Sequence, residues 1–173
     1  MRTQELQTAN SHEDTSIAGC STMMIKPLSD KIGKEIPFPF YATNGSAGMD
    51  LSACIDEPIT LKPGERKLIP TGIAIALPNE NCVGLIYARS SLGYKNGITL
   101  ANCVGVIDSD YRGELLVALI NLSEEEYTIA PSQRIAQLVI TPIVRPEISI
   151  VEELPETIRG AGGFGSTGKG HNQ

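Results

Sequence analysis

The chain of 173 residues has no tryptophan, only three phenylalanines and only two histidines. With so few aromatic residues, its core must consist mainly of valine, isoleucine, leucine and alanine. His12 and His171 lie in polar terminal segments, which argues against a histidine-based triad or metal cluster. The four cysteines are far apart and form no Cys-x-x-Cys pair, so we expect reduced thiols in a cytoplasmic protein rather than zinc or redox chemistry.

Long apolar runs and basic blocks are also lacking. No run approaches the length of a membrane span, and the N-terminus lacks the basic-then-apolar order of a secretion signal, so no membrane is expected as a partner. Twenty acidic residues against 14 basic ones give a net charge of −6, which argues against a nucleic-acid polymer as a partner. A small anionic ligand stays open because a few placed cations can outweigh the net charge locally.

The length predicts one domain with a proper core. Residues 1–22 are polar and aperiodic, which indicates a disordered extension or a start of translation at Met23 or Met24. Residues 23–154 are predicted to form a β domain, and residues 155–173 a flexible C-terminal arm.

Short β-rich segments cut by turn residues follow one another along the predicted domain. They favour an all-β sandwich or jelly-roll-like barrel. The predicted strands are Ile36–Tyr41, Gly48–Ala53, Ile59–Leu61, Glu65–Pro70, Gly72–Leu77, Cys82–Ala88, Ile98–Val106, Glu114–Asn121, Glu126–Ile129, Gln133–Val144 and Ser149–Val151.

One stretch, residues 89–97, breaks the β pattern. A serine there can cap a short helix that ends at Asn96-Gly97. A helix start beside Arg89 and two hydroxyls suits a phosphate, although this stretch taken by itself favours an ordinary capped turn between strands.

Acidic residues stand inside or after apolar strands at two places. Asp108 follows the apolar stretch that ends at Ile107, and aspartate is ionised at neutral pH and can accept a proton from water. Ordinary turn chemistry is the alternative for Asp108 and Asp110. Asp50 lies within an apolar run, which indicates a paired or ligand-directed carboxylate.

The segment 159–168, RGAGGFGSTG, combines five glycines with one arginine and one phenylalanine. It has no periodic apolar face, so it predicts a mobile arm. Such an arm can close over a flat anionic ligand by stacking, ion pairing and close backbone approach. A disordered glycine-rich tail is the alternative.

Taken together, these segments resemble the trimeric dUTP diphosphatase (dUTPase) family over about residues 25–168. Five motifs stand in the family's order: AGMDLSA, ARSSLG, ANCVGVIDSDYRGE, QRIAQLV and RGAGGFGSTG. The resemblance implies a jelly-roll-like (distorted β-barrel or sandwich) subunit with one short helix, and a homotrimer with shared active sites. It implies hydrolysis of dUTP to dUMP and pyrophosphate, which keeps uracil out of DNA and supplies dUMP for thymidylate synthesis. It also implies Mg2+ held by the triphosphate and waters, with no direct protein ligand.

The resemblance assigns roles to residues at matching positions. Asp108 would activate the water that attacks the α-phosphorus. The phosphates would be held by Arg89, Ser90 and Ser91, with Gly93 close by.

The base and sugar would be recognised by the hairpin. Its backbone, from Asn102 through Val106 and Ile107 to Leu116, would read the uracil edge. Tyr111 would pack beneath the deoxyribose and exclude a ribose 2′-OH.

The remaining motifs would complete the site. Asp50 and Gln137 would orient the phosphate-side network. Arg159 would meet the γ-phosphate, Phe164 would stack on uracil, and Gly165 would lie near the phosphates.

Two departures from the family pattern occur, in the second and fourth motifs. Ala88 replaces a usual proline, and Ser132-Gln133 replaces a usual Gly-Asp. A dCTP deaminase and a non-catalytic regulator on the same fold are the rival functions. The IDSDY hairpin and the phenylalanine-bearing arm favour dUTP hydrolysis over both. The cytoplasm is the expected location, with an organelle or the nucleus as the alternative in a eukaryote.

Overall fold

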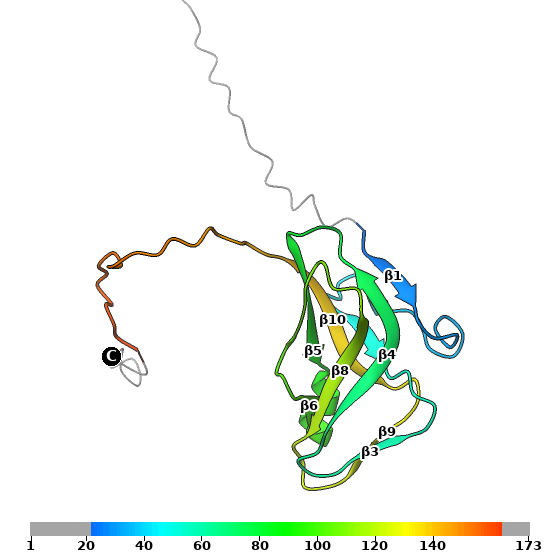
Figure 1. Ribbon diagram of the computed structural model, residues 1–173. Helices are drawn as coiled ribbons and strands as arrows, with labels where there is room; N and C mark the ends of the chain where they lie inside the picture. The colour runs from blue at the N-terminus through cyan, green and yellow to red at the C-terminus, as the bar shows by residue number, and fades with distance from the viewer. Residues whose placement is uncertain (1–21, 164–173) are drawn as a thin grey trace, which may run out of the picture.

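The computed structural model describes residues 22–163, which form two four-stranded antiparallel sheets and a small ribbon (Figure 1). The first sheet runs in the order β1 (Met24–Pro27), β4 (Arg66–Ala76), β8 (Glu114–Asn121) and β6 (Ile98–Leu100). The second runs β2 (Met49–Ser52), β10 (Arg134–Pro142), β5 (Cys82–Ala88) and β7 (Gly105–Ile107). The ribbon pairs β3 (Ile59–Leu61) with β9 (Tyr127–Ile129). This confirms the predicted all-β, jelly-roll-like class.

Aliphatic side chains fill the core, as the scarcity of aromatic residues predicts. Strand β8 illustrates the pattern, because Leu115, Val117 and Leu119 are all at most 1% exposed and alternate with outward-facing residues.

The outward side of β8 is apolar as well. Leu116, Ala118 and Ile120 face outward there, and the facing strand β4 places Pro70 opposite Leu116 and Leu68 opposite Ala118. Leu68 is 62% exposed. We call these five residues the apolar outer face. An antiparallel sheet that meets water is normally polar on its outer side, so this face has the character of a contact surface.

The short helix α1 (Ser90–Asn96) ends as predicted, with Gly97 in the left-handed conformation at φ 66°. The expectation of a serine N-cap is wrong. Arg89 occupies the N-cap with an extended backbone, and no side chain caps the helix. The helix therefore starts one residue earlier than a serine N-cap at Ser90 would place it. Ser90 and Ser91 are exposed in its first turn.

Several strand boundaries differ from those predicted. The predicted strand 98–106 is divided into β6, a turn and the start of β7, and the two strands predicted within residues 65–77 form the single strand β4 (Arg66–Ala76). Residues 36–41 make no strand, because Pro37 and Pro39 supply no N–H for a ladder. Residues 149–151 make no strand either. Ile148 and Ile150 are exposed, and no strand among residues 22–163 pairs with this segment.

Cys54 and Cys103 are free thiols. Across residues 22–163, no helix is long and apolar enough to cross a bilayer.

Candidate active site

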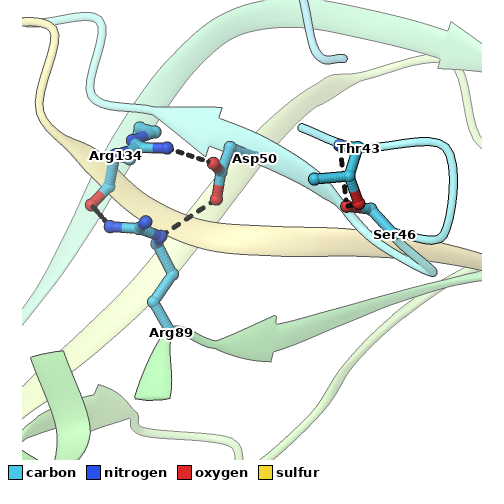
Figure 2. A network of polar contacts seen from close by, with 5 residues as sticks. All are labelled: Thr43, Ser46, Asp50, Arg89 and Arg134. Carbon is cyan, nitrogen blue, oxygen red and sulfur yellow. Dashed lines mark hydrogen bonds and ion pairs between the residues drawn. The ribbon is translucent and has the colours of Figure 1, made fainter. Parts of the chain in front are cut away.

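Two arginines converge on Asp50 at one end of the second sheet (Figure 2). Asp50 lies on β2, and its side chain is only 16% exposed. Arg89 Nε donates to Oδ1 at 2.9 Å, and Arg134 Nη1 donates to Oδ2 at 2.8 Å. Both carboxylate oxygens therefore hold guanidinium groups, which fixes the two arginines side by side.

Gln137 joins this cluster from β10, where it pairs directly with Asp50 of β2. Its Nε2 donates to the carbonyl of Ala88 at 3.1 Å, at the entrance to the phosphate motif. Gly48 leaves room for the amide, since a Cβ there would lie 2.9 Å from Gln137 Oε1. In α1, Gly93 is half-buried and donates its N–H to Arg89 O.

A second set of predicted residues lines a pocket beside the β7 hairpin. The pocket is a hollow of about 160 Å³ that opens to solvent. Its lining residues are Val106, Ile107, Asp108, Tyr111, Glu114 and Leu116. Five of these six are the residues to which the family resemblance assigns contact with uracil, contact with the sugar, or catalysis. Asp108 is exposed at the rim and also borders the neighbouring hollow that contains Arg145.

Tyr111 is held tightly against the backbone of its own hairpin. Its hydroxyl donates to Glu114 O at 3.0 Å. Gly113 lies beneath the ring, where a Cβ would come within 2.3 Å of the hydroxyl oxygen. Arg112 Nη1 donates to the carbonyls of Ser109 and Tyr111, both at 2.8 Å, and so closes the turn.

The two sets of residues lie at opposite ends of strand β5. Ile107 pairs with Gly84 near the beginning of β5, whereas Arg89 directly follows its last residue. Gly84 and Arg89 are five residue steps apart along the strand, about 16 Å at ~3.3 Å per step. Asp108 continues away from Arg89, so one chain does not bring these two residues together.

Other predicted residues stand apart from both sets. Asn102 is exposed in the turn between β6 and β7 and does not line the pocket. Arg159 is exposed on the segment that leaves the sheets after β10 (Figure 1), and its Nε donates to Gly162 O at 2.9 Å. Phe164 and Gly165 lie outside the described residues.

Sequence reasoning missed two residues of the site, Arg134 and Glu114. Arg134 begins the apolar run of β10, and Glu114 begins that of β8. A charged residue at the first position of a buried strand was the available signal in both cases.

The departure at Ser132-Gln133 preserves the turn before β10. Ser132 takes the left-handed conformation at φ 59°, and its hydroxyl donates to Glu35 O at 3.1 Å. Gln133 Oε1 accepts the N–H of Ala130 at 2.9 Å. An amide oxygen thus holds this turn without an acidic side chain.

The family model for dUTPase matches residues 34–168. The chain belongs to the dUTPase family. A deoxyuridine 5'-triphosphate nucleotidohydrolase from Idiomarina loihiensis is 56% identical over 145 residues, covering 84% of this chain and 96% of that protein. A protein of the same description from Hahella chejuensis is 52% identical over 146 residues, covering 84% and 96%.

Solved structures of dUTPases share the fold. A variant of the Staphylococcus bacteriophage 80alpha dUTPase with dUpNHpp superposes with a TM-score of 0.75 at 30% identity, covering 86% of this chain and 99% of that one. A variant dUTPase from phage phi11 of S. aureus, described as coordinating a structural Mg(II) ion, gives a TM-score of 0.69 at 26% identity. It covers 79% of this chain and 100% of that one.

Proposed function

We propose that this protein hydrolyses dUTP to dUMP and pyrophosphate by attack of water on the α-phosphorus. The observation that carries the proposal is the pocket in which Val106, Ile107, Asp108, Tyr111 and Leu116 meet. The pocket combines an apolar floor, an aromatic ring and a carboxylate, which suits a nucleoside beside a reacting phosphate. The dUTP nucleotidohydrolases at 52–56% identity support the same substrate.

Asp108 is the proposed general base. Its carboxylate lies at the rim of the pocket, exposed to water. It would take a proton from the attacking water, whose oxygen forms the new bond to the α-phosphorus as the bond to pyrophosphate breaks. Tyr111, fixed over Gly113, would lie beneath the deoxyribose and leave no room for a 2′-OH.

The cluster around Asp50 is the proposed phosphate site. One carboxylate faces two guanidinium groups, so Arg89 and Arg134 keep a net positive charge. That charge, with the exposed hydroxyls of Ser90 and Ser91, can hold phosphate oxygens.

Mg2+ is the proposed cofactor, carried by the triphosphate and waters. Within the described part of the chain, no three acidic, histidine or cysteine side chains are grouped to hold an ion, and Asp50 already accepts from two arginines. This donor set suits Mg2+, which keeps several waters and binds through substrate phosphates. The ion would neutralise charge on the leaving pyrophosphate.

We propose that the active protein is a homotrimer in which neighbouring chains share each site. Arg89 and Asp108 must act within a few ångströms on one nucleotide, yet they lie at opposite ends of β5. The apolar outer face supplies a contact surface, and Leu116 belongs both to that face and to the pocket.

The proposed division of the chain keeps residues 1–22 as an extension, 23–154 as the β domain and 155–173 as an arm. The exposed segment bearing Arg159 would carry the arm to a neighbouring chain, with Phe164 stacking on uracil. The cytoplasm is the proposed location, where nucleotide pools for DNA synthesis turn over.

A nucleotide panel tests the function. Pyrophosphate release from dUTP, dCTP, dTTP and UTP would be measured with Mg2+ and with the metal chelated. We expect strong preference for dUTP and, for Asp108→Asn, retained dUTP binding with turnover lowered by about 10²-fold or more. Ammonia release from dCTP would favour the deaminase, and binding without turnover of any nucleotide would favour the regulator.

A further inference from the structure

Glu114 makes two contacts that the proposed reaction does not use. Its side-chain Oε1 accepts the backbone N–H of Gly72 at 2.8 Å, and its carbonyl accepts the hydroxyl of Tyr111 at 3.0 Å. Glu114 is half-buried and lines the same pocket as Tyr111. One residue thus links strand β4 to the ring that would face the sugar.

The contact with Gly72 fills a defect in the β4–β8 ladder. Pro70 of β4 pairs with Leu116 of β8, and the next pair joins Ala74 to Glu114. Between these two pairs β4 has three residues and β8 has one, so β4 carries two extra residues. A bulge takes backbone groups off the ladder, and an N–H left there needs another acceptor. The Glu114 carboxylate supplies that acceptor.

Gly72 itself cannot easily shift to follow a displaced Glu114. Its φ is 72°, and a Cβ there would lie 2.6 Å from Cys54 Sγ, so its surroundings are closely packed. The neighbouring Thr71 hydroxyl donates to Leu115 O at 2.7 Å in a buried position. The bulge is therefore a rigid support against which Glu114 can be held.

Resting on the proposed dUTP hydrolysis, we propose that Glu114 is a positioning residue for sugar discrimination. Its carboxylate, anchored on Gly72, fixes the start of β8. Since the carbonyl of the same residue holds the Tyr111 hydroxyl, the anchor fixes the ring that excludes a 2′-OH. Loss of the anchor would let the ring move and would admit UTP.

The test compares kcat/KM for UTP and for dUTP. In Glu114→Ala we expect the UTP-to-dUTP ratio to rise roughly fivefold to tenfold, the factor expected for one lost hydrogen bond, with KM changing more than kcat. Glu114→Gln keeps an acceptor oxygen and should restore the ratio to within about twofold of wild type. If Glu114→Ala does not fold, Glu114→Asp takes its place in the test. Aspartate keeps the charge but is shorter, so this variant should also raise the ratio.

Glu65→Ala is the matched control. Glu65 Oε2 also accepts a backbone N–H, that of Lys62 at 2.8 Å, but it lies on the turn before β4 and does not line the pocket. The ratio should stay at the wild-type value in this variant. A general loss of stability would change both variants alike and would contradict the proposal.

A double-mutant cycle with Tyr111→Phe tests whether Glu114 affects the sugar preference through the Tyr111 hydroxyl. If Glu114 acts through the Tyr111 hydroxyl, Glu114→Ala should change the ratio by less than about twofold once that hydroxyl is gone. Full additivity, or an unchanged ratio in both Glu114→Ala and Glu114→Asp, would overturn the proposal. A wild-type protein that fails to hydrolyse dUTP would instead overturn the proposed function.

Discussion

Asn121 shows how one polar side chain holds separate segments together. It is fully buried, and its Nδ2 donates to Leu61 O at 3.0 Å and Glu125 O at 2.7 Å. Its Oδ1 accepts the backbone N–H and the hydroxyl of Ser123 at 2.9 and 2.7 Å. A buried amide with all its groups bonded joins β3, the end of β8 and the following turn.

Asn121→Leu should lower the free energy of unfolding by about 2–4 kcal/mol, because it leaves buried partners of the amide without hydrogen bonds. Urea denaturation would measure the change. Asn44→Ala, at an exposed loop position, serves as the control and should stay within ~0.5 kcal/mol of wild type. Equal effects of both substitutions would contradict the structural role of Asn121.

At the scale of elements, the C-terminal cap at Gly97 positions helix α1. Gly97 has φ 66°, and its N–H donates to Gly93 O at 3.1 Å. The next segment packs closely, because a Cβ on Gly97 would lie 2.8 Å from Ser123 N. Since seven residues make a marginal helix alone, this terminus and the buried Leu92 hold Arg89 and the serines in place.

Gly97→Ala should therefore cost more than the left-handed conformation alone, about 2–3 kcal/mol of unfolding free energy. Gly64→Ala is the matched control: its φ is 75°, but no atom lies within 4 Å of the added Cβ. It should cost only ~1 kcal/mol. Thermal unfolding of both variants gives the comparison, and equal losses would show that contact with Ser123 is unimportant.

At the scale of the whole molecule, the two sets of predicted site residues do not meet within one chain. The arginine cluster lies past the end of β5, and the hairpin pocket lies near its beginning. The apolar outer face borders the pocket through Leu116. A second chain bound there could complete the site without any rearrangement within the first.

Mixing two inactive variants tests this arrangement. Arg89→Ala and Asp108→Asn should each lose most activity, and co-refolding them should restore it. Random assembly would make about a quarter of the sites complete if the two residues come from different chains. A mixture of Arg89→Ala with Asp50→Ala is the control and should stay inactive, because Asp50 and Arg89 form one ion pair within one chain. Activity absent from the first mixture would contradict shared sites.

The sequence by itself determined the β class and the end of α1 at Gly97. Local patterns carry this information, because alternation of apolar residues and turn glycines acts within a few residues. The resemblance of its motifs to the dUTPase family pointed to five of the six residues that line the pocket. It did not reveal Arg134 or Glu114, whose importance depends on partners far along the chain, namely Asp50 and Gly72.

Only the tertiary structure decided that the predicted site residues fall into two separate sets, the arginine cluster and the hairpin pocket. The ladder register placed Asp108 and Arg89 at opposite ends of β5, and register depends on pairing between distant segments. Two predicted strands are not formed: residues 36–41 contain two prolines, and residues 149–151 have no neighbouring strand among the described residues 22–163. Local pattern favours a strand, but a strand forms only where another strand lies beside it to accept and donate its hydrogen bonds.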